Sequence, residues 1–176
     1  MADSVLVAYA TRSGSTREVA EAVAVTLCEH HLEVDIQLMK AGSSFAGYRA
    51  VVLGASLFMF RWHKDARRFL SRHRQVLQER PVAVFALAPF HDVEKEWEGV
   101  RSQLEKALVK FPWLKPVDIE IFGGKFDPAL LRFPWNLLPA LRMMPPSDIR
   151  DWTAIRTWAS NLADKFQYGS PEWWDN

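Results

Sequence analysis

The stretch VLVAYATRSGST, residues 5–16, joins a continuous apolar run to a loop rich in hydroxyl side chains. Apolarity that does not alternate along a run is typical of a strand covered on both faces, as strands are in a parallel sheet. The pattern that begins at Thr16 predicts a helix directly after the loop. Together these residues indicate the first strand, loop and helix of an α/β fold.

The rest of the chain repeats this alternation of strand and helix. Further strands are predicted at 34–38, 50–54, 82–88 and 117–122, and helices at 16–30, 64–75, 94–111 and 147–166. Parallel strands need crossover connections, and these are right-handed. We therefore expect a doubly wound five-stranded parallel sheet with helices on both faces, forming one domain over residues 1–168. Within it, 125–146 is an apolar insertion after the fifth strand, and 169–176 is expected to be a loose tail.

The composition fits a globular domain and excludes several classes of protein. Of the 176 residues 49% are hydrophobic and 24% are charged, and the formal net charge is +1, so neither disorder nor a fibre is expected. Cys28 is the only cysteine, which rules out a disulfide framework, a cysteine-based zinc site and an iron–sulfur cluster held by this chain's thiolates. No apolar run reaches the ~18 residues that a membrane span needs. We expect a cytoplasmic protein with no metal site and no nucleic-acid partner.

The loop after the first strand has the composition of an anion site. Its residues are Thr11, Arg12, Ser13, Gly14, Ser15 and Thr16. Backbone N–H groups, hydroxyl groups and the start of a helix together favour a bound phosphate. The loop lacks the Gly-Lys-Thr of a Walker loop and the three glycines of a dinucleotide fingerprint, so a monophosphate fits it better. The alternative is an ordinary helix start in which Ser13 or Ser15 serves as the cap.

Two more segments are expected to meet this loop at the carboxyl edge of the sheet, where doubly wound folds bind ligands. After the third strand come Ala55, Ser56, Leu57, Phe58 and Phe60, and after the fourth come Ala88, Pro89 and Phe90. The small residues would let a flat ring approach. The alternative is that the aromatic side chains simply cover the end of the sheet.

In these three segments the chain resembles the flavodoxin family, and within it the flavodoxin-like, quinone-dependent protoporphyrinogen dehydrogenases. The resemblance rests on residues 11–18 and on Gly54-Ala55-Ser56, followed by His63, Phe69, His73, Gly123-Gly124 and Asp151-Trp152. It implies a sheet of order 2-1-3-4-5 and an FMN cofactor, with the phosphate in the first loop and the ring between the other two segments. It also implies an oxidoreductase that passes electrons through FMN from a reduced substrate to an acceptor such as a quinone.

Two other functions remain open at this point. An electron carrier or partner-binding module would share the fold and the cofactor. A flavodoxin fold that has lost FMN is the other, because Phe60 stands where the related dehydrogenases usually have a glycine, close to the expected ring. His63 and His91 lie near the predicted pocket and are candidates for moving protons, although a single histidine is more often structural.

Charge and apolarity outside the pocket point to a substrate or a partner. Residues 58–80 contain seven Lys or Arg and two acids, a net charge of +5, which would attract an anionic substrate or an anionic membrane surface unless it is only a solvated helix face. The segment 126–146 combines many apolar side chains with Trp135, Arg132 and Arg142. It suits a homodimer interface, a flap over the domain, or a peripheral contact with the inner face of the membrane that would meet a lipid-soluble quinone.

Overall fold

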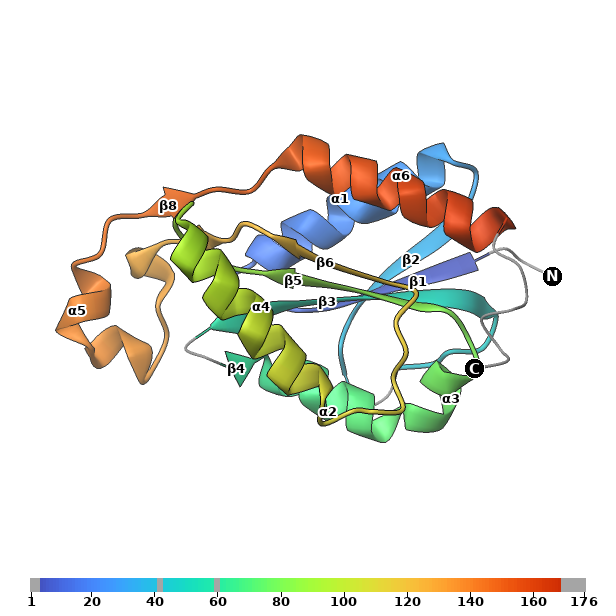
Figure 1. Ribbon diagram of the computed structural model, residues 1–176, viewed down its shortest axis with the longest axis horizontal. Helices are drawn as coiled ribbons and strands as arrows, with labels where there is room; N and C mark the ends of the chain where they lie inside the picture. Colours follow the sequence, from blue (N-terminus) through green and yellow to red (C-terminus); the bar gives the residue numbers. More distant parts are fainter. Residues whose placement is uncertain (1–3, 41–42, 59–60, 169–176) are drawn as a thin grey trace.

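The computed structural model of the chain describes residues 4–40, 43–58 and 61–168. At its centre lies a parallel sheet whose strands follow the order β2, β1, β3, β5, β6 (Figure 1). These strands are β1 Ser4–Ala10, β2 Glu33–Leu38, β3 Tyr48–Phe58, β5 Val82–Leu87 and β6 Asp118–Phe122. The short strand β4, Arg61–Trp62, pairs antiparallel with the end of β3. The predicted order 2-1-3-4-5 is confirmed, since β4 only shifts the numbering of the last two parallel strands.

Helices cover both faces of the sheet (Figure 1). On one face lie α1, Ser15–Glu29, and α6, Trp152–Tyr168; on the other lie α2, Lys64–Arg72, α3, Arg74–Gln78, and α4, Glu94–Leu108. Side chains alternate along β1, so Val5 and Val7 pack in the core beneath α1 and α6, while Leu6 and Ala8 pack in the core on the opposite face. Two separate cores, one on each face, therefore explain why β1 is apolar at every position from Val5 to Ala10.

Several predicted boundaries are wrong, including the end of the helix predicted at 94–111, which stops at Leu108. The third strand continues from Gly54 to Phe58, since it goes on pairing with β5 and then with β4. The helix predicted at 64–75 is interrupted at His73, which separates α2 from α3. The last helix begins at Trp152 rather than at Ser147.

The late start of α6 follows from a two-stranded antiparallel ribbon. Its strands are β7, Lys125–Phe126, and β8, Ser147–Asp148. After this ribbon, the Asp151 carboxylate accepts a hydrogen bond from the Ala154 N–H at 3.0 Å in the first turn of α6. The resemblance placed Asp151-Trp152 at the opening of the last helix, and this is confirmed.

Glycine is required where two segments pass closely. A Cβ on Gly54 would lie 2.0 Å from the Cζ of Phe85 on the neighbouring strand. A Cβ on Gly123 would lie 2.2 Å from the carbonyl oxygen of Ile149, and the next residue, Gly124, accepts a hydrogen bond from the Ile149 N–H at 3.1 Å. Gly123 and Gly124 thus bring Ile149, which directly follows β8, against the end of β6.

The insertion forms a short, irregular layer beyond the carboxyl edge of the sheet (Figure 1). It contains two 3₁₀ turns, η1 Pro128–Leu130 and η2 Trp135–Leu137, and one helical turn, α5 Pro139–Arg142. Phe133 is 77% exposed and Met143 is 84% exposed. Much of its apolar surface is therefore in contact with solvent rather than with the core. No helix within the described ranges is both long and apolar enough to cross a bilayer.

Candidate functional site

The loop between β1 and α1 is folded around Gly14 and Thr11. Gly14 has a φ of +95°, in the left-handed region that favours glycine, and its N–H donates to the Oγ1 of Thr11 at 2.9 Å. Gly14 itself occupies the capping position of α1, and no side chain caps the helix. The alternative in which Ser13 or Ser15 caps the helix is therefore wrong.

One hydroxyl group of this loop, that of Thr16, remains available for a ligand. Thr16 is fully buried, yet its Oγ1 has no hydrogen-bond partner among the described residues. Ser15 is also buried, whereas Arg12 and Ser13 are exposed. A buried hydroxyl without a partner costs free energy, and the first N–H groups of a helix find no partner within the helix itself. Both observations fit an anion bound at this loop.

The segment after the third predicted strand is a hairpin rather than an open loop. Ala55 and Leu57 point into the core, and only Ser56 and Phe58 are partly exposed. The Ser56 Oγ is buried and has no partner in the described structure, so it is a second polar group available to a ligand at this edge. Phe60 lies outside the described residues.

The third segment, Ala88, Pro89 and Phe90, follows β5. Ala88 and Pro89 are buried, and the Pro89 carbonyl accepts a hydrogen bond from the Gly124 N–H at 2.7 Å. Phe90 is partly exposed and faces Phe58, with the two ring centroids 6.0 Å apart. The predicted segments therefore meet at one edge of the sheet.

An aromatic cluster closes this edge. Besides Phe58 and Phe90, the cluster contains Trp135, whose ring is 5.5 Å from Phe58 in an edge-on arrangement, and Phe126, 5.3 Å from Phe90. The Arg12 guanidinium lies 5.5 Å from the centroid of the Phe58 ring, within cation–π range. We call these five residues the rim cluster. It joins the hydroxyl loop, the hairpin and the insertion.

A family model described as a flavodoxin domain matches residues 6–134. This range includes the hydroxyl loop, the hairpin and every residue of the rim cluster except Trp135. The chain belongs to the flavodoxin-domain family. Curated relatives of this flavodoxin domain are named protoporphyrinogen IX dehydrogenase [quinone]. The relative from Escherichia coli K12 is 26% identical over 132 residues, which are 73% of this chain and 70% of the relative. The relative from Leishmania major is 25% identical over 171 residues, 90% of this chain and 74% of the relative.

Solved flavodoxin structures share the fold of this flavodoxin domain. Oxidised flavodoxin 2 from Bacillus cereus superposes with a TM-score of 0.57 at 19% identity, over 93% of this chain and 97% of that one. A variant flavodoxin from Pseudomonas aeruginosa superposes with a TM-score of 0.60 at 13% identity, over 93% and 99% of the two chains. The predicted fold class and the predicted family are therefore confirmed.

Members of the family bind flavin, typically FMN, and the residues of this flavodoxin domain fit the two ends of that cofactor unequally. The unpartnered Thr16 hydroxyl at the start of α1 suits the phosphate. A ring stacked between Phe58 and Phe90 would need their planes about 7 Å apart, twice a van der Waals contact. Their centroids are 6.0 Å apart and the rings are tilted by 58°. A flavin ring at this position therefore requires the two phenyl rings to separate.

The two candidate histidines have different surroundings. His63 is only 6% exposed and caps α2, because its Nδ1 accepts from the Asp65 N–H at 3.2 Å. Burial lowers the pKa of His63, which keeps the imidazole neutral and able to accept that bond. His91 is partly exposed and its Nδ1 lies 2.9 Å from Glu96 Oε1. His63 thus has a structural task, whereas His91 remains open to solvent beside the edge.

Arg150 is an anchor of the site that the sequence did not reveal. Its side chain is 3% exposed and forms a fork with Asp148, at 2.8 and 2.6 Å, and an ion pair with Glu18 at 2.6 Å. The guanidinium also lies 4.7 Å from the Trp152 ring centroid. Because Glu18 is in the first turn of α1, Arg150 ties the end of the insertion to the helix that opens at the hydroxyl loop. No local signal marks this arginine, since Glu18 is 132 residues away in the sequence.

Proposed function

We propose that this flavodoxin domain is an FMN-dependent oxidoreductase similar to quinone-dependent protoporphyrinogen dehydrogenase, moving electrons from a reduced substrate to an acceptor such as a quinone. The observation that carries the proposal is the buried Thr16 hydroxyl, which has no partner within the described structure and sits where α1 begins. The names of the curated relatives support the choice of reaction.

The chain's own residues would hold the cofactor and shape its surroundings. Thr11, Ser13, Ser15 and Thr16 would bind the phosphate through hydroxyl and N–H groups, with Gly14 setting the turn. When bound, FMN supplies the redox chemistry, and the protein supplies binding, orientation and electrostatics. The rim cluster would exclude water from one side of the ring, and Ser56 would offer it a hydroxyl group. His91 is the better placed of the two histidines to exchange a proton with solvent.

An electron carrier is the alternative function. The family contains carriers as well as enzymes, and the exposed insertion offers a surface on which a redox protein would dock. The two functions differ in one requirement, because a carrier passes electrons to a partner protein while an enzyme reacts with small molecules directly.

Purification and reoxidation kinetics test the proposal. We expect the protein to be yellow, or to become so with added FMN, and to show flavin absorption bands. After chemical reduction without oxygen, a soluble quinone analogue should reoxidise the bound flavin in the absence of any other protein. Slow reoxidation that a redox protein accelerates would favour the carrier. A colourless protein that takes up no FMN would contradict both functions.

We further propose that the insertion contacts an anionic membrane surface from the cytoplasmic side. Its exposed apolar side chains lie beside Arg132 and Arg142, a combination that suits the interface between headgroups and acyl chains. Phe133 and Met143 are the most exposed of them, whereas Trp135 packs against Phe58. A flap that buries the whole insertion is inconsistent with these exposures. The insertion would place the site close to a lipid-soluble acceptor.

Co-sedimentation with vesicles of anionic phospholipid tests the membrane contact. The double variant Phe133→Ser/Met143→Ser should weaken binding by about tenfold or more, because each buried side chain of this size contributes roughly 1.5–3 kcal/mol. Val25→Ser/Val109→Ser is the control, since these valines are 58% and 76% exposed elsewhere on the surface. A dimer that dissociates in the Phe133 and Met143 variant, without vesicle binding, would assign the face to a second copy. Equal vesicle binding by both variants would contradict a role for the insertion.

A further inference from the structure

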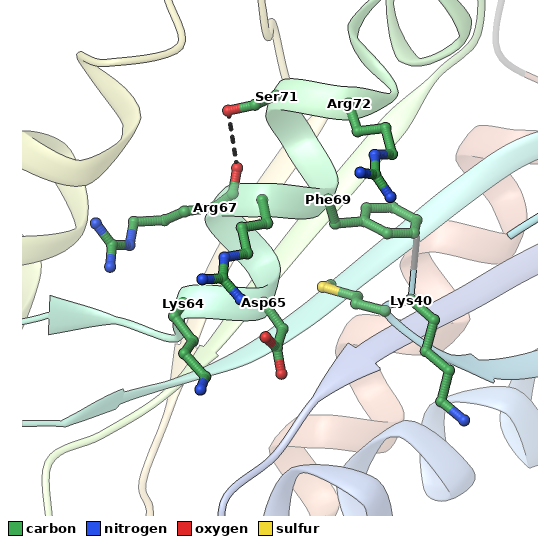
Figure 2. Close-up of a pocket in the computed structure, with 9 residues that line it drawn as sticks. Lys40, Lys64, Asp65, Arg67, Phe69, Ser71 and Arg72 are labelled. Carbon is green, nitrogen blue, oxygen red and sulfur yellow. Dashed lines mark hydrogen bonds between the residues drawn. The ribbon is translucent and has the colours of Figure 1, made fainter. Parts of the chain in front are cut away.

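A cavity of about 1070 Å³ lies between α2 and the two residues that follow β2, Met39 and Lys40. This volume is slightly above the range of about 300–1,000 Å³ that is usual for small-molecule pockets. Figure 2 shows Lys64, Asp65, Phe69 and Arg72 reaching from α2, with Lys40 coming from the separate segment. None of its lining residues belongs to the hydroxyl loop or to the rim cluster, so it is distinct from the candidate flavin site.

The lining is strongly basic. Five cations line the cavity, Lys40, Lys64, Arg67, Arg68 and Arg72, against one carboxylate, Asp65. None of the five has an acidic group within 4.0 Å among residues 4–40, 43–58 and 61–168, whereas Arg17, Arg101, Arg150 and Lys165 all form ion pairs. Cations that gather in a hollow without acidic partners raise the local concentration of anions. The cavity therefore favours a ligand with more than one negative charge.

The floor of the cavity is apolar. Met39 and Phe69 line it, and they are only 6% and 3% exposed. Their exposed edges would contact an apolar body, while the surrounding lysines and arginines would contact acid groups at its margin. The long aliphatic parts of those side chains add to the apolar surface. This arrangement differs from a flat basic face, which would suit a membrane, because it is concave and has a buried hydrophobic base.

We infer that this cavity binds a small molecule that carries two or more acid groups on an apolar body. Carboxylates and phosphates are both anionic, and either group would pair with the cations. The apolar surface of Met39 and Phe69 favours a ligand with an apolar body over a bare inorganic anion. The inference does not depend on bound flavin, so it can fail while the proposed function holds, and the reverse is also true. Under the proposed function, such a ligand would approach the edge of the sheet along α2.

Fluorescence titration with naphthalene-2,6-dicarboxylate tests the inference. We expect saturable binding that weakens when salt is raised, because ions screen exposed charges. The neutral dimethyl ester should bind at least about tenfold more weakly, since it keeps the apolar body and loses the charge. Inorganic pyrophosphate should compete poorly if the apolar floor contributes to affinity. Equal binding of the acid and the ester, or pyrophosphate binding tighter than the dicarboxylate, would overturn the inference.

Matched variants locate the binding site. Arg68→Gln/Arg72→Gln should weaken dicarboxylate binding by about tenfold, because two charge contacts from exposed arginines are lost. Lys95→Gln/Arg156→Gln removes the same net charge from exposed positions on α4 and α6 and should change the affinity by less than about twofold. An equal loss in both double variants would mean that net charge alone attracts the ligand, and would overturn the assignment.

A gain of affinity provides a second test that misfolding cannot imitate. Among the lining residues that the structure describes, Asp65 is the only carboxylate. Asp65→Asn removes its repulsion of an anion and should tighten dicarboxylate binding by about two- to fivefold at low salt. An unchanged or weaker affinity in a variant that keeps its circular dichroism spectrum would contradict the placement of the ligand. Binding only to anionic vesicles, with no response to the dicarboxylate, would contradict it as well.

Discussion

Replacing Thr16 by valine is expected to weaken FMN binding by about 10- to 100-fold, because a hydrogen bond to a charged group contributes roughly 1.5–3 kcal/mol. Valine has nearly the same shape as threonine, so the fully buried position stays filled. The free protein should lose no stability, since the hydroxyl that is removed has no partner in the described structure. Isothermal titration with FMN and a thermal melt of the free protein measure the two effects separately.

Thr26→Val is the matched control for this experiment. Thr26 is also buried in α1, but its hydroxyl donates to the Ala22 carbonyl at 3.0 Å and lies ten residues further along the chain. This variant should bind FMN with unchanged affinity and should lose about 0.5–1.5 kcal/mol of stability with its hydrogen bond. If Thr16→Val bound FMN as tightly as the wild-type protein, the phosphate would have to lie elsewhere.

Replacing Arg150 by methionine is expected to lower the free energy of unfolding by about 2 kcal/mol. A fully buried broken ion pair costs about 3–5 kcal/mol, but Asp148 and Glu18 are 41% and 48% exposed and regain water, which reduces the cost. Methionine retains the apolar stem of the side chain. Urea unfolding measures the loss, and Arg150→Lys should recover only part of the stability because lysine cannot form the fork with Asp148.

The same variant should change how stability depends on pH. The hydrogen bond from Arg150 lowers the pKa of Asp148. This stabilisation is therefore present above the pKa of the unfolded carboxyl, near 4, and is lost as the pH falls through the lower pKa of the folded state. Arg150→Met should lack this part of the acid-side decline.

Arg17→Met is the control for Arg150. It breaks the exposed pair with Glu21 at 2.8 Å and should cost much less stability than Arg150→Met, because water and salt screen an exposed pair. If the two variants lost equal stability, the burial of the Arg150 side chain would have no energetic importance.

Much of the fold could be predicted because its signals are local. The apolar run from Val5 to Tyr9 and the hydroxyl loop after it already define a strand, a turn and a helix start. Predictions were wrong where pairing joins distant residues, as when β8 pairs with β7 and displaces the start of the last helix. The same reason explains Phe58 and Trp135, which are in contact although they belong to segments far apart in the sequence.

The candidate site, like the fold, could be predicted from the sequence only in part. The residues of the hydroxyl loop could be named from the sequence, because their types and their place after a strand indicate an anion site. Their hydrogen-bonding state could not, since it depends on whether a side chain from elsewhere reaches them. In the described structure the Thr11 hydroxyl accepts a hydrogen bond from the Gly14 N–H, while the Thr16 hydroxyl has no partner. The roles assigned to these residues in holding FMN remain predictions.

The α/β architecture, the hydroxyl loop and the basic character of α2 could be inferred from the sequence, because periodicity, residue type and charge are properties of neighbouring residues. Which polar groups lack partners, and which surfaces meet, depends on tertiary packing. That packing brings Phe58 into contact with Phe90, places Arg150 between Glu18 and Asp148, and gathers five cations around a cavity with an apolar floor. Each of these depends on the distance between segments remote in sequence, which is set by packing on the two faces of the sheet.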